Sequence, residues 1–143
     1  MNSAAAGVAA ALTFVWLGMV LAISFLEAPL KFRAPGVTLR LGLGIGRLVF
    51  RALNICEAVL ALAVIIAVAA GRPPTAVAVL TTAVAVLLAI QLGAIRPRLN
   101  RRSNRVLAGD NVPRSHEHLY YVAIEVAKVI ALVALGTTLL VAT

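Results

Sequence analysis

Four long apolar runs, separated by shorter polar connections, decide what this chain can fold into. They cover approximately residues 5–30, 46–70, 75–95 and 119–141. A helix of about 20 residues crosses a bilayer core of about 30 Å, so each run is long enough to span one. The chain is 62% hydrophobic and only 13% charged, which leaves little material for a soluble domain. The sequence therefore predicts an all-α fold: a single-domain integral membrane bundle of four helices that run up and down.

The basic residues predict the side of the membrane on which each connection lies. Eleven of the 13 lysines and arginines lie in or beside the connections at 31–45 and 96–118, whereas the connection at 71–74 holds only Arg72. Basic loops stay preferentially in the cytoplasm. We therefore expect an inner (plasma) membrane protein with both long connections cytoplasmic and both termini on the non-cytoplasmic side.

The same basic connections limit the partners that the sequence predicts. The net charge of +8 arises between apolar runs rather than on a soluble surface, which argues against nucleic acid. Loops of this kind attract anionic lipid headgroups, at about 1 kcal/mol per basic residue. The bilayer and its anionic headgroups are the expected partners. A homo-oligomer or a larger membrane complex is also expected, because one four-helix bundle leaves little room for a pathway.

A polar stripe enters the membrane on the last apolar run. His118, Tyr121, Glu125 and Lys128 are spaced three, four and three residues apart, which places them on one face of a helix. Ionisable groups are costly at this depth and by default indicate a functional site.

Each of the other three runs carries one acid or amide near the same end of the bundle. These are Glu27, Glu57 and Gln91, and in an up-and-down arrangement they fall at the depth of Glu125. Arg51 and Asn54 precede Glu57 at helical spacing. The predicted binding site is a polar chamber between the four helices, formed by Glu27, Arg51, Asn54, Glu57, Gln91, His118, Tyr121, Glu125 and Lys128.

Two interpretations of this chamber stay open at the level of sequence. In the first, it is a structural lock: Glu27 pairs with Lys31 four residues on, and Glu57 or Glu125 pairs with Lys128 and Arg51. Asn54 and Gln91 then complete the hydrogen bonds. In the second, it binds or moves a cation, a proton or a small polar molecule, with Lys128 as an internal counter-charge and His118 and Tyr121 at the entrance. An accessory subunit of a larger membrane complex and a lipid-modifying membrane enzyme are the alternative functions. No residue is assigned as catalytic.

The sequence defines no metal site and assigns no cofactor. If a metal is bound, its candidate ligands are Glu27, Glu57, Glu125 and His118. A carboxylate di-iron bundle would place Glu on all four helices and use Glu-x-x-His pairs. Here Gln91 takes the fourth place, and no Glu-x-x-His occurs. The single cysteine, Cys56, excludes an internal disulfide.

Short motifs at the ends of the apolar runs resemble those of a known family. The segments are FVWLGMVLAISFLEAPLKF, IGRLVFRALN and QLGAIRPRLN, and their shared positions are Pro29, Phe32, Gly46, Arg47, Phe50, Pro97 and Arg98. In these the chain resembles the four-span family that includes transmembrane protein 205 and bacterial proteins of unknown function. The resemblance covers the chain loosely and implies a four-helix membrane bundle, but little about activity. It does not account for Glu27 or for the polar stripe of the last run.

Overall fold

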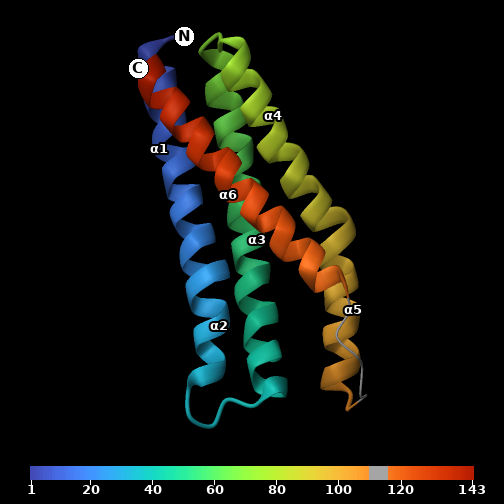
Figure 1. Ribbon diagram of the computed structural model, residues 1–143. Coiled ribbons are helices and arrows are strands. Elements are labelled where there is room, and N and C mark those ends of the chain that lie inside the picture. The colour runs from blue at the N-terminus through green and yellow to red at the C-terminus, as the bar shows by residue number, and fades with distance from the viewer. Residues whose placement is uncertain (110–115) are drawn as a thin grey trace.

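The computed structural model describes residues 1–109 and 116–143, with the side chains of residues 1–109 and 119–143 (Figure 1). All regular elements in these ranges are helices. In chain order they are α1 (Ser3–Val20), η1 (Leu21–Glu27), α2 (Ala28–Leu30), η2 (Lys31–Arg33), α3 (Leu39–Ala70), α4 (Thr75–Ile90), η3 (Gln91–Ile95), α5 (Arg96–Leu107) and α6 (His116–Ala142).

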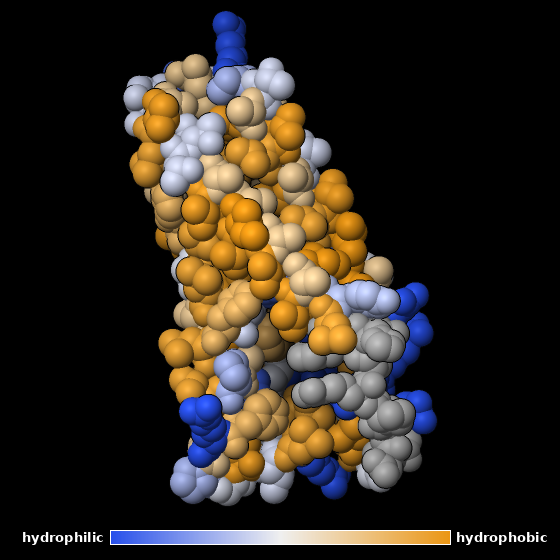
Figure 2. Space-filling model, viewed as in Figure 1, coloured by the Kyte–Doolittle hydropathy of each residue, from blue (hydrophilic) through white to orange (hydrophobic). Residues whose placement is uncertain are grey.

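Joined end to end, these elements form four rods that are long and apolar enough to cross a membrane. The rods are Ser3–Arg33, Leu39–Ala70, Thr75–Leu107 and Leu119–Ala142. The prediction of an all-helical chain with four such helices is confirmed, and the four apolar helices indicate a membrane protein. Apolar side chains also cover much of the outer surface, while strongly hydrophilic ones gather mostly towards the end that is lower in this view (Figure 2).

The rods alternate in direction, so both termini lie at one end of the bundle (Figure 1). We call this the terminal end and the opposite one the loop end. α1 packs against α3 and α6, and α4 packs against α6 and more lightly against α3. At the terminal end, the backbone N–H of Asn2 donates to the carbonyl of Gly71 over 2.9 Å. α6 crosses the bundle obliquely, from α1 at its C-terminal end to α4 and η3 at its N-terminal end (Figure 1).

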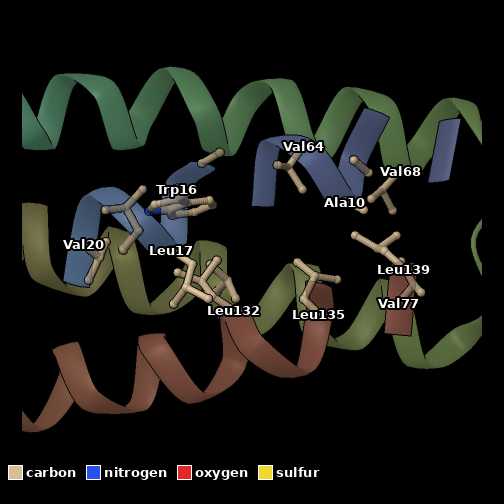
Figure 3. Close-up of a cluster of buried hydrophobic side chains, with 14 residues drawn as sticks. Ala10, Trp16, Leu17, Val20, Val64, Val68, Val77, Leu132, Leu135 and Leu139 are labelled. Atoms are coloured by element: carbon tan, nitrogen blue, oxygen red, sulfur yellow. The ribbon is translucent and has the colours of Figure 1, made fainter. Parts of the chain in front are cut away.

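An apolar core fills the interior between the middle of the bundle and the terminal end (Figure 3). Leu132, Leu135 and Leu139 recur every three or four residues on α6 and are fully buried. They pack with valines of α3 and α4 and with Leu17 of α1. Small residues of α1, such as Ala9, let its backbone approach its neighbours closely, which is how helices associate where lipid rather than water surrounds them.

Two wide helical turns occur at equivalent places on the first and third rods. In η1 the N–H that follows the element, on Ala28, reaches back five residues to the Ile23 carbonyl. In η3 the N–H of Arg96 reaches back five residues to Gln91 in the same way. In each rod, one residue separates the wide turn from a proline. In a regular α-helix a proline ring collides with the carbonyl four residues before it. The wider π-turn removes that collision and lets both rods continue past their prolines.

The helix boundaries correct the sequence prediction at the loop end. α3 begins at Leu39 rather than near residue 46, because the Thr38 hydroxyl caps it by accepting a hydrogen bond from the N–H of Leu41. The third rod continues through α5 to Leu107 rather than ending near residue 95. The connections predicted at 31–45 and 96–118 are therefore helical over much of their length. Hydropathy alone did not include the first turns of α3, LRLGLGI, which hold Arg40 and two glycines, or the arginine-rich α5.

Gly71 closes the turn between α3 and α4 under the N-terminus. A Cβ atom there would lie 2.8 Å from the Cβ of Ala5 and 3.0 Å from the side chain of Met1. The Ala5 methyl can move only with its backbone, so α1 would have to shift away from the turn. Gly18, in contrast, has nothing within 4 Å of an added Cβ.

We expect Gly71→Ala to lower the free energy of unfolding by about 1–3 kcal/mol, the usual range for an overpacked site. Gly18→Ala, the matched control, should be neutral or stabilising, because alanine is the better helix former. Unfolding titrations followed by circular dichroism in mixed detergent micelles compare the two. Equal effects would contradict the close packing of the N-terminus on this turn.

Candidate functional site

The ammonium group of Lys128 is fully buried in the middle of the bundle and is surrounded by oxygen atoms. Its Nζ lies 2.5 Å from Glu57 Oε1, on α3, and 2.7 Å from Glu125 Oε1, on α6 itself. It also donates to Gln91 Oε1, at the start of η3, over 2.7 Å. An ammonium has three donors. Three helices thus supply three oxygen atoms to one cation.

Both carboxylates receive a second donor from the first rod. The indole Nε1 of Trp16, on α1, donates to Glu57 Oε1 over 2.9 Å. The hydroxyl of Ser24, within η1, donates to Glu125 Oε2 over 2.9 Å. We refer to Trp16, Ser24, Glu57, Gln91, Glu125 and Lys128 as the Lys128 cluster. Every rod of the bundle contributes to it.

The cluster holds more negative than positive charge. Its two carboxylates, each only 1% exposed, face a single ammonium. If both acids were ionised, one negative charge would be left over in the apolar interior, where an unbalanced charge is costly. Within the described part of the chain, Glu57 Oε2 is buried without a hydrogen-bond partner. A bound proton or another monovalent cation would balance the cluster.

Local backbone geometry brings these groups together. Glu125 and Lys128 are three residues apart on α6 and so share its inner face. Ser24 and Gln91 both lie on π-turns, which re-aim side chains relative to a regular helix and frequently occur at functional sites. The prolines that require these turns therefore also shape the site.

A cavity of about 500 Å³ lies beside the cluster towards the loop end. Ser24 and Glu125 belong both to its wall and to the Lys128 cluster. The rest of the wall comes from η1, α2, η2, α3, α5 and α6, and it is both aromatic and basic. Its cations are Lys31, Arg47, Arg96 and Arg102. In Figure 2 the surface is hollowed in this half of the molecule.

Four of the predicted site residues come together as expected, and others do not. Glu57, Gln91, Glu125 and Lys128 form the cluster. Tyr121 is 7% exposed and lines the cavity. Glu27 is not in the cluster and instead pairs with Lys31, four residues along, over 3.8 Å.

Arg51 and Asn54 also lie apart from the Lys128 cluster. They line a second hollow, of about 810 Å³, where Arg51 is exposed and Asn54 half-buried. The contacts expected of a lock are therefore present for Glu27 with Lys31 and for Lys128 with its two acids and Gln91, but Arg51 and Asn54 take no part in them.

The metal prediction is only partly covered by the structure. The side chain of His118 lies outside the described residues, although its backbone belongs to the first turn of α6. Within the described residues, no three His, Cys, Asp or Glu side chains are grouped as metal ligands. Of the candidate ligands, Glu57 and Glu125 share a location, and both are engaged with Lys128.

Sequence reasoning did not include Trp16, Ser24 or Arg96 in the site. The first of these carried a usable signal: a tryptophan in the middle of an apolar run must find a partner for its indole N–H. Ser24 lies four residues after the buried Val20 and seven after the buried Leu17, so helical spacing already places it on the inner face, but a serine alone does not indicate a site.

We expect Lys128→Met to lower the free energy of unfolding by about 3–5 kcal/mol, because it leaves two carboxylates buried without their cation. Adding Glu57→Gln should recover part of this loss by removing one of those charges. Lys31→Met serves as the control and should cost less than Lys128→Met, since its ion pair with Glu27 is longer, at 3.8 Å, and the Glu27 side chain is 35% exposed. Unfolding titrations in detergent measure all three, and a double variant that is less stable than Lys128→Met would refute the charge assignment.

Comparison with protein-family models, with curated proteins and with solved structures finds no match for this chain. The case for a function therefore rests on the Lys128 cluster and the cavity beside it.

Proposed function

We propose that this membrane protein binds a proton, or another small cation, at the Lys128 cluster and exchanges it with the loop end through the cavity. The observation that carries the proposal is the position of Glu125. Its Oε1 contacts Lys128 over 2.7 Å, and the same residue forms part of the cavity wall. It connects a buried cluster that is one positive charge short to a space outside it.

The spacing of the groups favours a proton over larger cations. Glu125 Oε1, Lys128 Nζ and Glu57 Oε1 follow one another at 2.7 and 2.5 Å, within reach for proton transfer. A proton that arrives at Glu125 can be relayed, because Lys128 can pass one proton to Glu57 and accept another from Glu125. The ammonium itself occupies the centre of the cluster, where a metal ion would otherwise lie.

The apolar core supports a site that is reached from one side. Leu132, Leu135 and Leu139 follow Lys128 along α6 towards the terminal end, and all three are fully buried. The cavity lies in the other direction, among the basic residues. Since basic loops are retained in the cytoplasm, the proposed exchange takes place with the cytoplasm, across the inner leaflet of a plasma membrane.

The test is a proton-uptake measurement on three isosteric variants. Infrared difference spectra between pH about 6, where exposed carboxylates are already ionised, and alkaline pH should show one carboxylic acid C=O band in the purified wild-type chain. Glu57→Gln and Glu125→Gln should each lose this band, because the remaining carboxylate and Lys128 then balance. Glu27→Gln, the matched control outside the cluster, should keep it.

The choice of these variants makes it less of a concern that a lost band reflects misfolding. Each single glutamine in the cluster leaves one carboxylate for one ammonium, so we expect both variants to fold. A wild-type band that persists unchanged in Glu57→Gln and in Glu125→Gln would refute the proposal.

A further inference from the structure

We infer that the cavity beside the Lys128 cluster is a binding site for a phosphate-bearing anion, held by Arg96. This ligand is opposite in sign to the proton of the proposed function and lies in a different place, so the inference goes beyond that function. The chemistry is that of a phosphate group, whether it is free or part of a lipid headgroup.

Arg96 is held in an unusual way. Its guanidinium lies 4.6 Å from the ring centre of Phe50 and 4.4 Å from that of Tyr121, and these two rings meet edge to face at 6.1 Å. Aromatic faces attract a cation but do not neutralise its charge. Among residues 1–109 and 119–143, no carboxylate forms an ion pair with it. The aromatic pair fixes the direction of a charge that still needs an anion.

The donors of Arg96 are available at the cavity wall. Its Nε and Nη2 atoms are buried and have no hydrogen-bond partner among the described residues. A buried donor without a partner costs free energy. These two nitrogens form one edge of the guanidinium fork, the edge that binds two oxygens of a phosphate or carboxylate at once.

A second buried group on the same wall also lacks a partner. The side chain of Ser103, on α5, is 7% exposed, and its Oγ has no hydrogen-bond partner among the described residues. A serine in a helix can usually bond to the carbonyl four residues earlier. Here it lines the cavity with Arg96 instead and can donate to an anion there.

The overall charge and shape of the cavity fit an amphiphile with a phosphate group. Arg47 adds positive charge to the wall, whereas Lys31 is paired with Glu27. Among the described wall residues the only carboxylate is that of Glu125, which is already paired with Lys128. Phe25 and Leu99 add apolar surface. A volume of about 500 Å³ is in the usual range for small-molecule sites and is larger than a bare phosphate needs.

The experiment titrates the delipidated full-length chain in a neutral detergent with three probes. These are dioctanoyl phosphatidic acid, dioctanoylglycerol, which lacks the phosphate, and inorganic phosphate. Binding to the folded state raises the thermal unfolding midpoint, from which the apparent Kd is obtained. The variants are Arg96→Gln and Ser103→Ala, and the matched control is Arg98→Gln, an exposed arginine two residues away on the same helix.

Phosphatidic acid should stabilise the wild type and Arg98→Gln alike. Arg96→Gln should weaken its binding about tenfold or more, as expected for the loss of charge-assisted hydrogen bonds. Ser103→Ala should weaken it several-fold, and this variant decides the matter if Arg96→Gln does not fold. Arg96-dependent binding of inorganic phosphate alone would identify the free anion as sufficient, and binding of phosphatidic acid only would identify a headgroup.

Two results would overturn the inference. Equal losses in Arg96→Gln and Arg98→Gln would mean that the basic surface attracts anions without a defined site. Equal binding of dioctanoylglycerol and phosphatidic acid would mean that the cavity takes apolar chains and that the phosphate is irrelevant.

Discussion

The rest of this structure depends on one buried charge. An ammonium in the middle of an apolar bundle has to be surrounded by oxygen atoms, and here α3, η3 and α6 each supply one to Lys128. The helices cannot slide or rotate relative to one another without breaking these contacts. The structural and the functional interpretation of the polar chamber are therefore compatible. The contacts that fix the helix register also leave one buried carboxylate more than the number of ammonium groups.

Much of this arrangement could be predicted from helical spacing and depth. Apolar length predicted the four rods, and the spacing of Glu125 and Lys128 put both on one inner face. Glu57 and Gln91 were predicted to lie near Glu125 and Lys128 only because they occur at the same level of the bundle. Arg51 was predicted to share the inner face of its helix with Glu57, but it does not. Six residues separate the two, which is about one and two-thirds turns of an α-helix, so their side chains point in different directions. Residues spaced three apart look regular in a sequence, yet each one lies further around the helix from the face of the first.

The π-turns explain what helical spacing could not predict. Glu27 lies seven residues after the buried Val20 and would share its face in a regular α-helix, but the wider turn between them rotates Glu27 away from the cluster and towards Lys31. Ser24, only four residues after Val20, stays on the inner face against Glu125. The two prolines signal the end of an apolar run in the sequence but not the wide turn before it. The cavity, likewise, is lined by residues from all four rods, so it could not be predicted from the spacing along any one of them.

Trp16 is the only tryptophan of the chain, and its indole N–H donates to Glu57 Oε1. All tryptophan emission from this protein therefore comes from a ring in direct contact with the buried cluster. The indole excited state is sensitive to the charge of a group to which it is hydrogen-bonded. The molecule thus contains its own optical reporter, and a change in the ionisation of Glu57 can be followed in the native chain without any label.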